Sequence, residues 1–300
     1  MQNKKHVLES YNSIILIFLT AFLGGGIGTF TKISITEIPP LFFTLFRFVF
    51  AALVLLPFII KNKNFHFNSF KKIFFVSLLA TANVTLFVFG ARKTTATISQ
   101  MLYAAVPLIA GIFSFSLFKE KLSSKKIFGI IIGFVGVLVI ILLPVLGQKN
   151  MFNGDLIGNL IIFVAVCSFS LYSVLSKKIQ NKFTPLEITM VFILTTILVE
   201  VLLIPFSLTS NYGWLTHLSF KAIFGVAYVG IIGTGIYYLI YQFAVKHSTP
   251  VVASMTFYLQ PIFAFLWAAA LLGEKLTTGF IFGVILAFIG VMLVTNFGKK

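Results

Sequence analysis

Ten long apolar runs dominate this chain of 300 residues and limit what it can fold into. A helix that crosses a bilayer needs about 20 mostly apolar residues. Clusters of Pro, Gly, Asn and Lys separate the runs, as expected where helices start and stop. The runs cover residues 13–31, 40–60, 72–90, 96–118, 127–146, 155–176, 186–206, 220–242, 250–272 and 279–297. The sequence therefore predicts an all-α membrane protein with ten transmembrane helices.

The scarcity of charge supports a lipid environment. Charged residues make up 10% of the chain and hydrophobic residues 59%, whereas a soluble domain carries about 25% charged residues. A net charge of +16 is compatible with nucleic-acid binding, but the lysines lie in short clusters between apolar runs and form no continuous basic stripe. We therefore exclude nucleic acid as a partner and expect the lipid bilayer instead.

The distribution of Lys and Arg predicts how the chain is oriented. With the N-terminus in the cytoplasm, sixteen basic residues lie on the cytoplasmic side and six on the other, as the positive-inside rule requires. The cytoplasmic set is Lys4, Lys5, Lys61, Lys63, Lys71, Lys72, Lys119, Lys121, Lys125, Lys126, Lys177, Lys178, Lys182, Lys246, Lys299 and Lys300. The opposite set is Lys32, Arg92, Lys93, Lys149, Lys221 and Lys275. We expect a multi-pass protein of the cytoplasmic (inner) membrane with both termini cytoplasmic.

The two halves of the chain resemble each other at an offset of 154 residues. Residues 120–137 and 274–291 share ten identities in eighteen positions, including the motif Glu-Lys-Leu at 120–122 and 274–276. Each copy holds five spans, and because five is odd the second copy is inverted relative to the first. Inverted repeats are typical of secondary transporters. The predicted domains are residues 1–147 and 148–300, each a five-helix repeat.

These features resemble the EamA family of the drug/metabolite transporter superfamily. The resemblance rests on the stretch Arg47-Phe48-Val49-Phe50-Ala51-Ala52 and on the repeated pattern from Pro107 and Pro261 through the Glu-Lys-Leu motifs. One departure is Leu23-Gly24-Gly25-Gly26, where members often carry a Trp-Gly pair. The resemblance implies alternating-access transport of a small metabolite, most often an amino acid or related compound, with export favoured. The resemblance is compatible with coupling to a proton and with exchange against a counter-substrate.

Two ionisable residues lie inside predicted spans, where burial of a charge is costly and points to function. Arg47 and Glu200 are each six or seven residues from the outer end of their span, so about 9–10 Å deep. They could pair with each other or act separately. Arg47 could instead stabilise the fold by binding helix carbonyls, as the family's retention of an arginine here across unlike substrates implies. Glu200 could couple transport to protons or extend towards the interface.

Helix-breaking residues predict where the substrate binds. Pro107 and Pro261 are expected near the middle of the fourth and ninth spans, where each frees a backbone carbonyl. Interrupted helices at membrane depth are tolerated where they line a cavity, although a simple packing kink is the alternative. Gly24 and Gly28 favour close helix packing and could also form a hinge in the first span.

Polar side chains close to these breaks are the predicted substrate-binding residues. They are Asn83, Gln100, Tyr103, Tyr237, Tyr241, Tyr258 and Gln260. Asn83 and Tyr237 are equivalent at the 154-residue offset, so we expect them to face each other across a pseudo-twofold axis. Together these groups predict a largely uncharged cavity with aromatic walls, suited to amino acids or flat heterocycles. Each could also form only a hydrogen bond between helices.

The sequence offers little support for catalysis. The four histidines are scattered through tails and loops, the single cysteine lies in an apolar run, and no HExxH or acidic cluster occurs. We expect no enzyme activity, no cofactor and no metal site. A membrane-embedded enzyme of lipid metabolism and a non-transporting membrane scaffold are the alternative functions. The first would need clustered acids or histidines near one interface, and the second would not need prolines within spans of both repeats.

Overall fold

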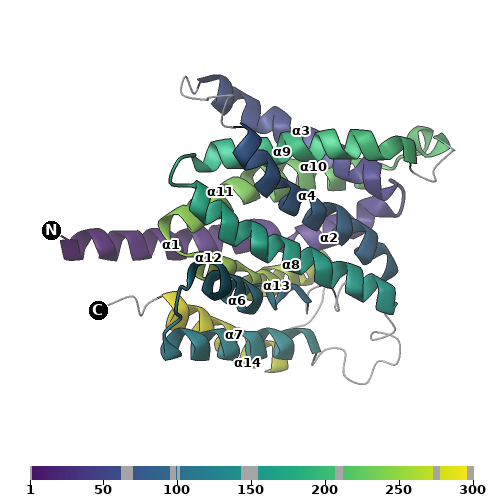
Figure 1. Cartoon of the computed structure of the whole chain (residues 1–300). Helices are drawn as coiled ribbons and strands as arrows, with labels where there is room; N and C mark the ends of the chain where they lie inside the picture. The colour runs from purple at the N-terminus through teal and green to yellow at the C-terminus, as the bar shows by residue number, and fades with distance from the viewer. Residues whose placement is uncertain are drawn as a thin grey trace.

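The computed structural model describes most of the chain as a bundle of helices (Figure 1). The described residues are 2–61, 70–94, 99, 102–142, 155–206, 212–272 and 278–295. Within these ranges the regular structure is helical and no strand occurs. The prediction of an all-α protein is therefore confirmed for this part of the chain. Gln100 and the second Glu-Lys-Leu motif, residues 274–276, lie outside the described residues.

The helices follow the predicted apolar runs. The first half contains α1 (Gln2–Gly25), α2 (Ile27–Ile35), α3 (Pro40–Lys61), α4 (Phe70–Lys93), α6 (Val106–Phe118) and α7 (Ser124–Leu142). The second half contains α8 (Leu156–Ile179), α9 (Pro185–Leu203), α10 (Phe220–Gly230), α11 (Tyr237–His247), α12 (Pro250–Ser254), α13 (Thr256–Leu272) and α14 (Thr278–Thr295). A π-helical segment, η5 (Ile231–Ile236), joins α10 to α11, and the short 3-10 helices η3 (Ile204–Phe206) and η4 (Gly213–Thr216) precede α10.

Seven of the described helical segments are long and apolar enough to cross a membrane. They are Ile14–Ile35, Pro40–Lys61, Phe70–Lys93, Leu156–Ile179, Pro185–Phe206, Phe220–His247 and Pro250–Trp267. Two shorter apolar helices are Val106–Phe118 and Ile281–Thr295. The fourth, fifth and tenth predicted spans each run into residues outside the described ranges. The structure therefore supports a multi-pass membrane protein, while ten spans stay a prediction.

Local sequence signals explain where several helices begin. Thr184 caps α9 with a reciprocal capping box, in which its hydroxyl accepts from the Glu187 N–H and the Glu187 carboxylate accepts from the Thr184 N–H. Pro185 follows in the first turn, where a missing N–H costs nothing. Asp155 caps α8 in a similar way by accepting from the backbone N–H of Ile157.

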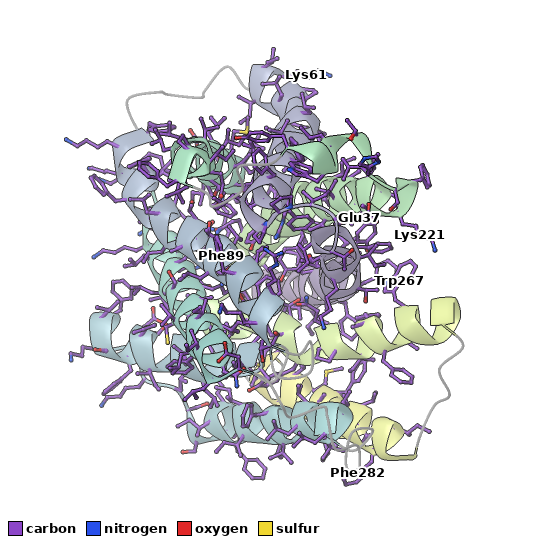
Figure 2. The ribbon with its side chains drawn as sticks, turned by 90° about the vertical axis from the view of Figure 1, so that its right-hand side faces the viewer. Glu37, Lys61, Phe89, Lys221, Trp267 and Phe282 are labelled. Atoms are coloured by element: carbon purple, nitrogen blue, oxygen red, sulfur yellow. The ribbon has the colours of Figure 1, made fainter. Side chains whose placement is uncertain are left out.

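The surface of the bundle is apolar and many of its polar side chains are buried. Phe89 on α4 and Phe282 on α14 project outward, with 40% and 57% of their surface exposed (Figure 2). Buried residues include Arg47, Asn83 and Glu200. This arrangement, with hydrocarbon outside and hydrogen-bonded groups inside, suits a protein surrounded by lipid.

Glycines bring α7 and α14 into close contact (Figure 1). A Cβ added to Gly136 would lie 2.5 Å from the backbone nitrogen of Ala287, and one at Gly129 would lie 3.0 Å from the carbonyl oxygen of Gly290. Residue numbers therefore rise along one helix as they fall along the other, so the two helices are antiparallel. Small residues of this kind let membrane helices approach closely.

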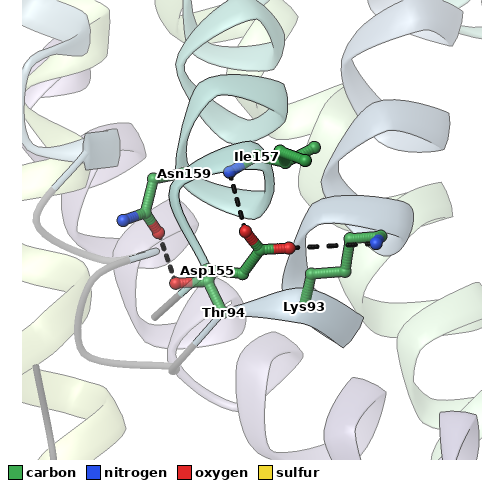
Figure 3. A network of polar contacts seen from close by, with 5 residues as sticks. All are labelled: Lys93, Thr94, Asp155, Ile157 and Asn159. Carbon is green, nitrogen blue, oxygen red and sulfur yellow. Dashed lines mark hydrogen bonds and ion pairs between the residues drawn. The ribbon is translucent and has the colours of Figure 1, made fainter. Parts of the chain in front are cut away.

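Polar contacts join the end of α4 to the start of α8 (Figure 3). The Lys93 ammonium lies 3.8 Å from the Asp155 carboxylate, and the Thr94 hydroxyl donates to the Asn159 side-chain oxygen. The backbone N–H of Asp155 also donates to the Lys93 carbonyl. The first helix of the second half is thus fixed beside a helix of the first half.

Candidate functional site

A cavity of about 120 Å³ lies at the centre of the bundle and receives side chains from both halves. Its walls come from α1, α2, α3, α4, α8, α11, α13 and the segment before α6. The lining residues are Gly24, Gly25, Ile27, Gly28, Thr31, Lys32, Arg47, Asn83, Val84, Phe87, Ala91, Ser99, Tyr103, Phe169, Tyr237, Tyr238, Phe257, Gln260, Pro261 and Ala264.

The two ends of the cavity differ. Lys32, near the end of α2, is exposed, so the cavity reaches the surface there. Phe169, Tyr237 and Phe257 are almost completely buried. The cavity therefore opens near Lys32, at the end of the first span opposite its N-terminal start, and ends among aromatic rings.

Arg47 is the buried cation of this cavity. It is 3% exposed, its Nε donates to the Thr234 hydroxyl, and its guanidinium is hydrogen-bonded to Tyr238. Thr234 belongs to η5, and its hydroxyl donates a hydrogen bond to the carbonyl of Val229, five residues earlier. The π-helical segment thus turns a hydroxyl towards the arginine, and π-helical turns of this kind are frequent at functional sites.

The close contact between α3 and the end of α10, where η5 begins, depends on glycine. A Cβ at Gly230 would lie 2.6 Å from the carbonyl oxygen of Arg47. No side chain fits at that distance without moving backbone. The sequence therefore places glycine where Arg47 must lie against the second half of the protein.

Two amides contribute polar groups on opposite walls. Asn83 donates to the Tyr103 hydroxyl at 2.6 Å and to the Ala165 carbonyl at 2.8 Å. Gln260 donates to the Gly24 carbonyl at 2.9 Å, while its side-chain oxygen is buried without a hydrogen-bond partner. An unpartnered amide oxygen of this kind is chemically suited to accept from an N–H donor.

Some predicted binding residues line the cavity and others do not. Asn83, Tyr103, Tyr237 and Gln260 all line it, so Asn83 and Tyr237 do share one site. Tyr241 and Tyr258 are buried outside the lining. The Tyr241 hydroxyl bonds Ser173, and the Tyr258 hydroxyl donates to the Ile130 carbonyl.

Of the residues predicted to break or hinge a helix, some line the cavity and one does not. Gly24, Gly28 and Pro261 line the cavity, and Pro261 lies inside α13 as expected. Pro107 does not line the cavity and is the second residue of α6, because the chain turns at Ala104 and Ala105 before that helix begins. The break before Pro107 relieves the helix of a missing N–H in its interior.

Glu200 lies apart from Arg47. It is fully buried on α9, where one carboxylate oxygen accepts from the Thr85 hydroxyl and the other has no partner. Glu200 is absent from the cavity lining, and the described structure shows no ion pair between it and Arg47. The two side chains therefore do not pair with each other in this structure.

The cavity is more positive than the sequence predicted. Arg47 and Lys32 both line it, and no Asp or Glu among the residues that the structure describes does. Several lining rings, including Phe87, Phe169 and Phe257, were not predicted, because 37 phenylalanines along the chain give no signal for any one of them. Tyr238 could have been found from its place beside Tyr237. The described residues contain no group of three His, Cys, Asp or Glu side chains that could hold a metal.

A set of hydrogen bonds joins α8 to α11 at the end of the bundle where α8 ends. The Gln242 amide donates to the Tyr172 hydroxyl at 2.7 Å and accepts from Gln180 at 2.7 Å. The Lys177 ammonium donates to the carbonyls of Val245 and Lys246, both at 2.9 Å. With the bond between Ser173 and Tyr241, these contacts form what we call the α8–α11 polar contact.

The chain is a polytopic helical bundle with a cavity lined from both halves, an arrangement that secondary transporters commonly show. A model of the EamA-like transporter family matches residues 12–142 and again residues 156–296. These matches span most of the chain, and the protein belongs to this family.

Similar proteins come from distant organisms. An uncharacterized transporter of Archaeoglobus fulgidus is 26% identical over 94% of this chain and 96% of its own. A WAT1-related protein of Arabidopsis thaliana is 23% identical, covering 96% of this chain and 91% of its own. A solved crystal structure, 16% identical in sequence, matches with a TM-score of 0.77 over 96% of this chain and 97% of its own. At that identity the last likeness shows the fold alone.

Proposed function

We propose that this protein is a secondary transporter that moves a small metabolite, an amino acid or a related compound, by alternating access. The observation that carries the proposal is a cavity lined from both halves that reaches the surface near Lys32, while the α8–α11 polar contact holds two helices together where α8 ends. A carrier must expose one site to the two sides in turn, so one closed and one open end is the arrangement expected of it.

Comparison of equivalent positions supports this reading. At the 154-residue offset, Tyr241 and Val245 of α11 match Phe87 and Ala91 of α4. Tyr241 and Val245 are bonded to α8 in the closed contact, whereas Phe87 and Ala91 line the open cavity. The same structural positions are thus closed in one half and open in the other. Exchange of these two arrangements would open the cavity to the opposite side.

Helix packing supports two inverted repeats with five spans each, residues 1–147 and 148–300. Gly129 lies against Gly290. At the 154-residue offset, Gly129 is equivalent to Gly283 and Gly290 is equivalent to Gly136, and Gly283 also lies against Gly136. A pair of helices that maps onto itself in this way is expected of a pseudo-twofold axis. The two successive matches to the family model support the same division.

Orientation follows from the charges. In Figure 1, α1 begins and α14 ends on the same side of the molecule, on the left, in keeping with two termini on one side of the membrane. The excess of basic residues assigns that side to the cytoplasm. The cavity, which opens near Lys32, then faces away from the cytoplasm. We infer location in the cytoplasmic membrane and export as the direction of transport, as the family resemblance favours.

The cavity chemistry supports the substrate class, and Glu200 supports one form of coupling. The cationic and amide side chains of the cavity suit a small polar compound, and its aromatic rings suit an apolar body. The buried, partly unpartnered carboxylate of Glu200 supports proton binding, with exchange against a counter-substrate as the alternative.

Flux through proteoliposomes tests the proposed function. The full chain would be reconstituted and offered a panel of labelled amino acids and related metabolites, with empty liposomes as the control. We expect saturable uptake or counterflow of at least one compound. No flux of any compound by protein that is shown to be folded would favour a membrane-embedded enzyme or a scaffold instead.

A further inference from the structure

We propose that Arg47 binds a carboxylate of the substrate, so that the cavity selects a compact organic acid with an apolar or aromatic body. This inference rests on the proposed function, since it concerns the same cavity. It goes further because it assigns a chemical group of the substrate to a named side chain.

The charge of the cavity gives the first reason. Arg47 and Lys32 line it, and none of its lining residues is acidic. The polar partners that the structure records for Arg47 are the hydroxyls of Thr234 and Tyr238, which are neutral. A cation buried at membrane depth is costly unless it is paired, and an anionic ligand would supply the missing charge.

The placement of Arg47 gives the second reason. Its guanidinium donates to Thr234 of η5 and is hydrogen-bonded to Tyr238 of α11, and its backbone carbonyl lies against Gly230, so little ordering remains to be done when a ligand arrives. A guanidinium can bind both oxygens of a carboxylate through parallel N–H bonds, which gives geometric selectivity as well as attraction. A fixed arginine in a cavity is therefore suited to carboxylate recognition.

Neighbouring groups complete the site. The Tyr103 oxygen accepts from Asn83, so the tyrosine hydrogen can point into the cavity and donate to an anion. Phe87, Phe169 and Phe257 supply the apolar wall. Because none of the described residues that line the cavity is acidic, these residues offer no counter-charge to a cationic ligand. The favoured ligand thus carries a carboxylate at one end and a ring or aliphatic group at the other.

A matched pair of probes tests the inference without any substitution. The full chain in lipid nanodiscs would be titrated with 3-phenylpropanoate and with 3-phenylpropanamide, which differ chiefly in the charge of one end. We expect the acid to bind at least tenfold more tightly than the amide. Equal binding of the two probes, or no binding of the acid, would overturn the inference.

Substitution then assigns the preference to one residue. Arg47→Gln is expected to remove the preference for the acid, and Arg47→Lys to keep part of it. Arg92→Gln makes the same chemical change at an exposed residue of α4 outside the cavity lining, so it is expected to keep the full preference. Retention of the preference in Arg47→Gln would contradict the assignment.

The outcome separates this inference from the proposed function. Transport of metabolites that lack a carboxylate, with no effect of the probe acid, would overturn the role of Arg47 and leave a transporter. Tight acid binding by Arg47 without flux of any compound would support the site and contradict transport.

Discussion

Gly24 and Gly28 lie on either side of the break between α1 and α2, and both line the cavity, but their surroundings differ. A Cβ at Gly24 would lie 2.7 Å from the Tyr237 ring and 3.0 Å from the Gln260 amide. A Cβ at Gly28 would meet nothing within 4 Å. The two glycines, which look equivalent in the sequence, therefore have different roles.

This difference predicts the effect of two matched substitutions. Gly24→Ala should push Tyr237 and Gln260 into the cavity and weaken substrate affinity by about tenfold, which corresponds to the low end of the usual cost of overpacking. Gly28→Ala should leave affinity within about twofold of the wild type. Substrate affinity measured from concentration-dependent flux would check this, and equal effects at both positions would favour a hinge over a packing role.

Substitution of Glu200 tests whether transport is coupled to protons. If it carries the coupled proton, Glu200→Gln should abolish the dependence of transport on the pH gradient while leaving exchange of substrate across the membrane intact. Thr85→Val removes the hydrogen bond to Glu200 without removing the carboxylate and serves as the comparison. Transport that depends on pH equally in wild type and Glu200→Gln would rule out this coupling.

Individual site residues were predictable where their chemistry is rare in a membrane span. Arg47, Asn83 and Gln260 stand out because polar groups are few in apolar runs, and all three line the cavity. The aromatic wall could not be predicted, since the 37 phenylalanines are spread through most of the helices and none stands out. The separation of Glu200 from Arg47 was also beyond the sequence, because equal depth in two helices does not fix which faces meet.

At the scale of helices, the carboxylate of Glu37 connects the loop after α2 to the start of α10. It accepts from both the backbone N–H and the hydroxyl of Ser219, each at 2.7 Å, and Ser219 caps α10. These two hydrogen bonds lower the pKa of Glu37 below its ordinary value. The ionised form is therefore favoured in the folded state.

The sign of that shift predicts a pH-dependent effect on stability. A carboxylate with a lowered pKa stabilises the fold above its ordinary pKa, and the stabilisation is lost as pH falls through the lowered value. Glu37→Gln should therefore lower the melting temperature of the purified protein at pH 7, and the difference from wild type should shrink once the pH is well below about 4. A difference that is unchanged across this range would contradict the role of the charge.

Helix boundaries show how far local sequence determines structure. The ends at Thr184, Ser219 and Thr249 follow from capping side chains. The π-helical segment η5 could not be predicted, because Gly230, Gly233 and Gly235 permit it without requiring it, and the sequence does not show that this segment packs against α3. The break before Pro107 follows from the proline, which is better tolerated in the first turn of a helix than in its interior.

At the scale of the whole molecule, the apolar runs and the 154-residue offset were enough to predict an all-helical membrane protein of duplicated design. They could not predict which end of the cavity is open. Two halves of similar sequence can adopt either of two exchanged arrangements, and small differences in packing energy decide between them. The α8–α11 polar contact, which has hydroxyl and amide groups on both helices, favours closure at its end.

Thiol accessibility at two equivalent positions tests alternating access between inverted halves most directly. In a Cys167→Ser background, Ala91→Cys and Val245→Cys would be labelled with a membrane-impermeant maleimide from each side of the membrane, with and without a transported substrate. Without substrate, we expect Ala91→Cys to react from the non-cytoplasmic side and Val245→Cys to be protected. With substrate, we expect the labelling of Ala91→Cys to decrease and Val245→Cys to become reactive from the cytoplasmic side. Reaction of both positions from the same side, or rates that do not change with substrate, would contradict alternating access.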